Sequence, residues 1–293
     1  MRPIVFVLCC LMSLAVGQAY GDAPVDSVSP TKPRVYALVA AVGERFSFVY
    51  EVKHVGSRLE PYRRSVVNVP GFLDRFVLQD LDKAIAQFDP DSKRVYMTLA
   101  TPPLDGVAPS ERANVTLSRL VGQLKKMPQR LEWDRIVVVT PAYQLFELDG
   151  LATKLQGFGV FTQPLEGALL DFAGSEIALG QQGRVDAITP GNKAIKSQTY
   201  VAPYSYIEVW VLDPQNLAVL DRQRRFESQK FADPMSGSLD INQSISKEFL
   251  AARIVSLIEV SVREAVMRTE INPRRGEVQV GEPRVVERAD AKK

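Results

Sequence analysis

The chain has 293 residues, of which 46% are hydrophobic and 24% are charged, and its formal net charge is +2. This hydrophobic fraction is typical of a folded protein and excludes a chain that is disordered along its whole length. The near balance of charges gives no dominant positive field, so we expect no nucleic-acid partner. One histidine and two cysteines are too few for most zinc, thiol and serine–histidine catalytic sites.

Residues 1–19 predict a cleaved secretory signal peptide. Arg2 precedes an apolar run over residues 4–16, and the small residues Gly17 and Ala19 stand before a cleavage point. The apolar run is shorter than the ~20 residues that a spanning helix needs, so no integral membrane segment should remain after cleavage. We therefore expect a soluble protein that is periplasmic or secreted.

Cleavage after Ala19, or at a second acceptable point after Ala23, would also remove Cys9 and Cys10. The mature chain would then have no cysteine, and hence no disulfide, thiol nucleophile or thiolate metal site. We expect no cofactor and no metal.

The rest of the chain divides by composition. Residues 20–33 hold three prolines and several small residues, which is typical of a flexible lead. Residues 272–293 are dense in Arg, Glu, Lys and Pro without an apolar period, which predicts a charged, disordered tail. Residues 34–271 should form a single domain.

Nearly continuous apolar runs, each opened by an arginine, occupy residues 34–41, 94–100 and 135–140. Runs of this kind predict strands that are buried on both faces of a sheet. Helical periodicity over 73–88 and 113–124 separates them. This order predicts parallel strands joined by right-handed helical crossovers.

Further strands are predicted over residues 46–50 and 64–69, as an antiparallel extension beside the first strand. Residues 150–198 are rich in glycine and read as a long excursion with short strands, or with a small helix near residues 165–172. An excursion of that length is uncommon unless it is functional or partly disordered. It could cover a cleft.

Residues 206–212 alternate between apolar and polar side chains, residues 213–216 have turn chemistry, and residues 217–226 return as a second strand. A broad apolar stripe over residues 244–270 predicts a long helix that packs on the sheet. Together the elements predict an α/β fold. It has a single mixed β-sheet flanked by helices, an antiparallel hairpin extension and a long C-terminal core helix.

Several familiar motifs are missing from the sequence. His54 is the only histidine, no Gly-x-Ser-x-Gly elbow would present a serine to it, and it reads as an exposed loop residue. No phosphate-binding loop occurs, and Gly157-Phe158-Gly159 lacks the third glycine of a dinucleotide motif.

Ligands of open α/β sheets bind outside the carboxyl ends of the parallel strands. Glu44, Arg45, Asp105 and Tyr143 follow the predicted strands and are the polar groups expected at those ends. Glu44 and Asp105 are weak catalytic candidates, because neighbouring carboxylates can share acid–base work. Ordinary loop polarity is the alternative, since Asp-Gly is also a plain turn pair.

Tyr204, Tyr206 and Trp210 form the densest aromatic cluster. They could bind a partner or a glycan, or they could pack as one face of the hairpin beneath the glycine-rich excursion. The arginines of residues 222–225 on the return strand are read as edge-strand charges that discourage unwanted pairing.

These observations predict an exported, non-enzymatic protein that binds a small ligand or an envelope protein, or helps to assemble the envelope. The alternative is a hydrolase with carboxylates at the strand ends. The sequence indicates neither a substrate nor an oligomeric state.

Overall fold

The computed structural model describes residues 32–51, 62–101, 104, 106–143, 155–163, 185–197, 199–233, 235 and 244–275. The predicted signal peptide, His54 and Asp105 lie outside the described residues. So do residues 164–184 of the glycine-rich stretch, with the small helix expected near 165–172, and residues 276–293 of the predicted tail.

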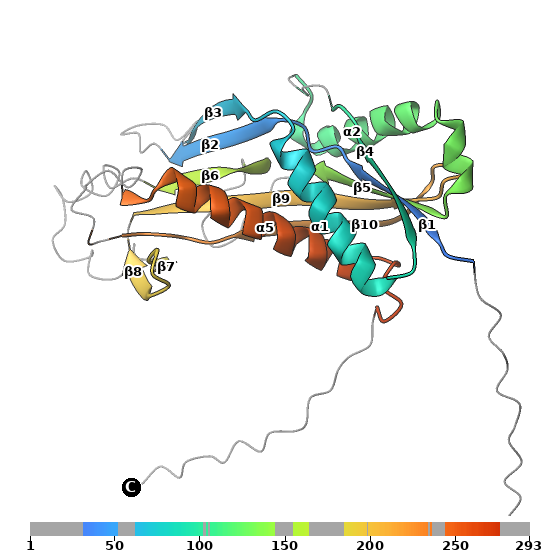
Figure 1. The fold of residues 1–293 in the computed structure, drawn as a ribbon. Helices are drawn as coiled ribbons and strands as arrows, with labels where there is room; N and C mark the ends of the chain where they lie inside the picture. Colours follow the sequence, from blue (N-terminus) through green and yellow to red (C-terminus); the bar gives the residue numbers. More distant parts are fainter. Residues whose placement is uncertain are drawn as a thin grey trace, which may run out of the picture. The chain divides into compact units, whose positions relative to one another are not determined.

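The described chain forms an eight-stranded mixed sheet with the order β3-β2-β6-β9-β5-β1-β4, and β10 pairs with β9 (Figure 1). These strands are β1 (Val35–Ala40), β2 (Arg45–Glu51), β3 (Tyr62–Asn68), β4 (Lys93–Thr98), β5 (Arg135–Pro141), β6 (Gly157–Gln163), β9 (Tyr200–Leu212) and β10 (Val219–Ser228). A separate antiparallel pair consists of β7 (Val185–Ile188) and β8 (Ala194–Ser197). The helices are α1 (Phe72–Phe88), α2 (Pro109–Leu124), the short 3₁₀ helix η1 (Pro128–Glu132) and α5 (Lys247–Met267). The predicted fold class is confirmed.

The sheet consists of two arms that meet along β9. The first part of β9 pairs with β6 and the second part pairs with β5, while β10 runs along its other edge. The first arm is β5-β1-β4, which is entirely parallel, and the second arm is β6-β2-β3. Residues 41–44 lead from β1 in the first arm to β2 in the second. The strands of the first arm therefore end where the second arm begins.

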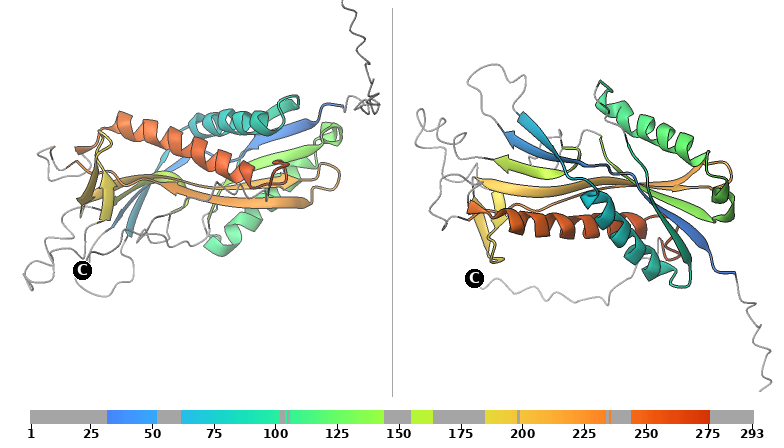
Figure 2. Two further views of the ribbon diagram at one scale, coloured as in Figure 1. Left: turned by 90° about the horizontal axis from the view of Figure 1, so that it is seen from below. Right: turned by 45° about the horizontal axis from the view of Figure 1, so that its top comes forward.

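Helices cover both faces of the sheet: α1 and α5 lie on one face and α2 lies on the other (Figure 2). Leu81 of α1 and Ile258 of α5 are buried in one hydrophobic cluster with the sheet residue Leu38. Leu120 of α2 packs in a second cluster with Val138 on the opposite face. This two-sided cover explains why the continuous apolar runs of β1 and β5 are buried.

Local capping and a buried hydroxyl pair fix α5 on the sheet. The Ser246 hydroxyl accepts a hydrogen bond from the backbone N–H of Phe249 at 3.2 Å, which caps the first turn. Ser205 of β9 and Ser261 of α5 are buried with their hydroxyl oxygens 2.8 Å apart.

In the described part of the chain, no helix combines the length and the hydrophobicity needed to span a membrane.

The structure corrects the sequence interpretation in several places. The run over 94–100 was expected to be buried on both faces, but β4 is an outer strand with Tyr96 53% exposed. The segment over 46–50 does not lie beside the first strand, because β2 continues from β1 and pairs with β6. The predicted tail includes residues 272–275, which form turns with Asn272 buried.

Candidate functional site

A cavity of about 620 Å³ opens where the two arms of the sheet separate. Its walls come from the β1–β2 junction, alternate residues along β3, the ends of β4 and β5, the start of β6, and the first turns of α1 and α2. The carboxyl ends of the three parallel strands β1, β4 and β5 meet at this place, which is where open α/β sheets bind ligands.

The break between β1 and β2 depends on Gly43 and Asp74. Gly43 adopts a φ of 72°, in the left-handed region that favours glycine. Asp74, in the first turn of α1, accepts a hydrogen bond from the backbone N–H of Val42 at 3.2 Å. Burial raises the pKa of the Asp74 carboxyl, and the charge of Glu44 raises it further, although hydrogen bonds from Val42 and Gly43 oppose the rise.

Three arginines line the cavity: Arg45 at the start of β2, Arg64 on β3 and Arg112 on α2. The charges of Arg112 and Arg45 both lower the pKa of Arg64, after the larger effect of burial around its guanidinium. The ionised form of the Tyr204 phenol would work in the opposite direction. Arg64 as a whole residue is exposed, so it keeps contact with solvent while its charge lies close to the other two.

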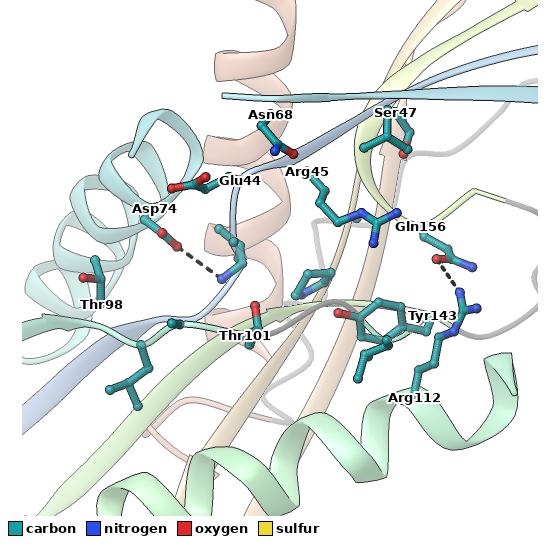
Figure 3. Close-up of a pocket in the computed structure, with 18 of the residues that line it drawn as sticks. Glu44, Arg45, Ser47, Asn68, Asp74, Thr98, Thr101, Arg112, Tyr143 and Gln156 are labelled. Carbon is teal, nitrogen blue, oxygen red and sulfur yellow. Dashed lines mark hydrogen bonds between the residues drawn. The ribbon is translucent and has the colours of Figure 1, made fainter. Parts of the chain in front are cut away.

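Arg112 is held in place by neutral partners. Its Nε donates to the carbonyl oxygen of Val107 at 2.9 Å, and its NH1 donates to Oε1 of Gln156 at 2.8 Å (Figure 3). Tyr143 lies between Arg112 and Thr101 in the same view. Burial raises the pKa of the Tyr143 phenol, and the charges of Arg112 and Arg45 partly offset this rise.

The opposite end of the cavity is acidic. Figure 3 shows Glu44 and Asp74 side by side at one end, with Arg45, Gln156 and Arg112 at the other. A neighbouring groove of about 580 Å³ along α1 and β4 shares Glu44, Asp74 and Thr98 with the cavity. The site therefore combines both signs of charge in one continuous depression.

Several predicted site residues lie in this cavity. Glu44, Arg45 and Tyr143 all contribute to its lining, as expected for polar groups that follow the parallel strands. Asp105 lies outside the described residues, so its expected proximity to Glu44 stays a prediction. In the described structure, the carboxylate neighbour of Glu44 is Asp74.

The aromatic cluster does not form an exposed binding surface. Tyr204, Tyr206 and Trp210 are only 0%, 1% and 2% exposed. They project from the even positions of β9, which pairs with β6 and β5 along one edge and with its hairpin partner β10 along the other. The Trp210 indole N–H donates to the Thr140 hydroxyl at 3.0 Å. The interpretation of this cluster as one packed face of the hairpin agrees with this burial.

Tyr204 also helps to build the wall beneath the cavity. Burial raises the pKa of its phenol to about 12, although the charge of Arg64 opposes the rise. Ser47 and Arg64 both line the cavity. Gly159 of β6 leaves the space that the Tyr204 hydroxyl fills.

Two arginines of the edge strand β10 form ion pairs with a buried carboxylate on β9. Glu208 of β9 is 1% exposed, and its Oε1 accepts hydrogen bonds from Arg222 Nε at 2.6 Å and Arg224 NH2 at 3.0 Å. Arg222 also lies over the Trp210 ring, 4.2 Å from its centroid. The sequence interpretation missed this buried carboxylate, although the cross-strand pairing of a hairpin with alternating polarity could have indicated it.

Sequence reasoning also missed Arg64, Asp74 and Arg112. Arg112 follows the end of β4 by one loop, so the rule that placed Tyr143 could have found it. Arg64 and Asp74 reach the cavity only through the β2–β3 register and the position of α1. Among the residues that the structure describes, no group of three or more His, Cys, Asp or Glu side chains could hold a metal ion.

No protein-family model matches the chain, and no curated protein matches it by sequence. Solved structures do show similarity. A Xanthomonas campestris protein of the DUF330 family has 10% identity and a TM-score of 0.32, covering 84% of this chain and 91% of that one.

A Helicobacter pylori protein, described as a homolog of a neuraminyllactose-binding hemagglutinin, has 8% identity and a TM-score of 0.35, covering 84% of this chain and 88% of that one. A Neisseria meningitidis lipoprotein has 8% identity and a TM-score of 0.27, covering 78% and 97%. Identities and TM-scores this low carry no argument about activity, ligand or partner.

Proposed function

We propose that the protein is an exported, non-enzymatic binding factor that holds an anionic group of its ligand or envelope partner in the cavity between the two arms of the sheet. The observation that carries this proposal is the presence of Arg45, Arg64 and Arg112 in the lining of one cavity. A guanidinium cannot lose its charge in a protein, and its planar donors match the oxygens of carboxylates and phosphates.

The electrostatics support an anion at this end of the cavity. Arg45 and Arg112 disfavour the charged form of Arg64, so a bound anion would relieve a repulsion that already exists. The described ion pairs join neither Arg64 nor Arg112 to a carboxylate, and the hydrogen bonds of Arg112 go to a carbonyl and an amide. The cavity volume of about 620 Å³ falls in the usual range of ligand sites.

Removal of these arginines should weaken anion binding. We expect Arg45→Ala and Arg112→Ala to bind inorganic phosphate, phenyl phosphate or succinate at least about tenfold more weakly, since each charge-assisted hydrogen bond contributes roughly 1.5–3 kcal/mol. Isothermal titration calorimetry at low salt measures this, after circular dichroism shows that the variants fold.

Arg119→Ala is the matched control, because Arg119 is exposed on the same helix and does not line the cavity. It should bind these anions as the unchanged protein does. If the unchanged protein binds none of the three anions, or if the Arg45 and Arg112 variants bind them equally well, the proposal is wrong.

Export has its own test. The full chain, expressed in a bacterial host, should appear in the periplasmic or secreted fraction with its amino terminus at Tyr20 or Pro24, as cleavage after Ala19 or Ala23 requires. Intact-mass measurement identifies the terminus. Leu11→Arg interrupts the apolar run and should leave the uncleaved precursor in the cells. An uncleaved chain in the unchanged protein would contradict export by this signal.

A hydrolase is the second candidate. Glu44 lies beside Asp74, whose pKa is raised by burial, and a carboxyl with a raised pKa can act as a general acid. The binding function is favoured over hydrolysis because the Asp74 carboxylate already accepts a hydrogen bond from the backbone N–H of Val42. Turnover of an ester, phosphate or glycoside substrate that is lost in Glu44→Gln would instead favour the hydrolase.

A further inference from the structure

We infer that the ligand of this cavity is a zwitterion, whose anionic group binds the three arginines and whose ammonium group binds Glu44 and Asp74. This inference rests on the proposed function and names the class of its ligand. It follows from the separation of charge along the cavity, with an acidic end at the β1–β2 junction and a basic end at Arg45 and Arg112 (Figure 3).

The acidic end favours a cation. Glu44 and Asp74 lie next to each other at this end of the cavity (Figure 3), and the charge of Glu44 raises the pKa of the Asp74 carboxyl, so the two carboxylates repel each other. Arg75 lines the adjoining groove, yet within the described ranges no ion pair joins it to either carboxylate. An ammonium group placed between Glu44 and Asp74 would neutralise this repulsion and donate up to three hydrogen bonds.

Asp82, the third carboxylate of the adjoining groove, already has two partners within the protein. Asp82 accepts a hydrogen bond from the Tyr96 hydroxyl at 2.7 Å and forms an ion pair with Arg94 at 3.4 Å. Glu44 has no such partner among the described contacts, and it is exposed where the cavity and the groove meet. The ammonium position is therefore assigned to Glu44 and Asp74 rather than to Asp82.

Two charged ends at a fixed separation should select ligands by length. A ligand with a single anionic group satisfies the arginines and leaves the acidic end unoccupied. A ligand with the right spacing gains a second ion pair with no change in the protein. This gain should be small for each ion pair in a partly exposed site, but it depends on length and on both signs of charge.

The test compares two series of probes on the full chain at pH 7 and low salt. One series is the aminoalkyl phosphates with about two to six carbons, and the other is the alkyl phosphates of the same lengths. At the best length, the aminoalkyl phosphate should bind about fivefold more tightly than its partner, since a partly exposed ion pair contributes up to about 1 kcal/mol. The ω-amino carboxylates and the simple carboxylates repeat the comparison with a different anion.

Glu44→Gln should remove this advantage without weakening the binding of alkyl phosphates, because it takes a negative charge out of the cavity that these anions enter. Glu111→Gln is the matched control, because Glu111 is exposed in the first turn of α2 and does not line the cavity. Equal affinities in the two series at every length would overturn the zwitterion, and so would an advantage that survives in Glu44→Gln. If no anion of any series binds, the proposed function itself fails.

The same chemistry could come from a free metabolite or from a lipid headgroup. Sedimentation with vesicles of phosphatidylethanolamine and phosphatidylcholine distinguishes the two sources. Vesicle binding that the best aminoalkyl phosphate displaces would indicate a headgroup, and binding of the soluble probe alone would indicate a free ligand.

Discussion

Gly159→Ala is expected to lower the free energy of unfolding by about 3 kcal/mol, a large effect for one methyl group. A Cβ atom at this position would overlap the carbonyl oxygen of Ser47 on β2 and lie 2.6 Å from the Tyr204 hydroxyl. The overlap with Ser47 involves backbone of the paired strand, so no side-chain rotation can relieve it. Denaturation with urea, followed by circular dichroism, measures the change.

The chain supplies a control of opposite sign. Gly122 lies in α2, and nothing is within 4 Å of an added Cβ atom there. Gly122→Ala should therefore stabilise the protein by about 0.5–1 kcal/mol, because alanine favours the helix. Adding Tyr204→Phe to Gly159→Ala should recover only part of the loss, since the overlap with Ser47 stays. A Gly159→Ala variant as stable as the unchanged protein would show that β2 and β6 do not approach as closely as described.

Glu208→Ala should destabilise the protein by a similar amount, about 3 kcal/mol, at the low end of the range for breaking a buried ion pair. The carboxylate is 1% exposed and is the described partner of two partly buried guanidinium groups, Arg222 and Arg224. Its removal leaves these two positive charges next to each other, with Trp210 beneath one of them. Chemical denaturation of the variant measures the loss.

The surface pair of Lys196 and Asp186 provides the comparison. Their charged atoms are 2.6 Å apart, but the side chains are 61% and 87% exposed. Asp186→Ala should change the stability by less than about 0.5 kcal/mol, because solvent screens such pairs. A loss below 1 kcal/mol for Glu208→Ala would mean that the cost of desolvating Glu208 cancels its two ion pairs.

The sequence predicts some strands better than others, for a physical reason. The runs of β1, β4 and β5 look alike, and two of them are buried as expected. The third, β4, has exposed Val95 and Tyr96 because it pairs only with β1 among the described strands. A continuous apolar run indicates a strand, but its burial depends on its place in the sheet order, which the run itself does not encode.

In the candidate site, too, the sequence predicted some residues and missed others. Glu44, Arg45 and Tyr143 could be found because they directly follow parallel strands, and the ends of such strands meet. Arg64 could not be found in this way, because it reaches the cavity from within β3 through the antiparallel pairing with β2. The aromatic residues of β9 were visible in the sequence, but their burial follows from the place of that strand between β10 on one side and β6 and β5 on the other.

The sequence by itself therefore determined the three α-helices, most of the strands and the parallel direction of the strands in the first arm, because hydrophobic periodicity and turn residues act over short distances along the chain. Only the tertiary structure decided that the sheet divides into two arms and that three arginines and two carboxylates line the space between them. Such convergence depends on strand register and helix placement, which arise from contacts between residues far apart in the sequence.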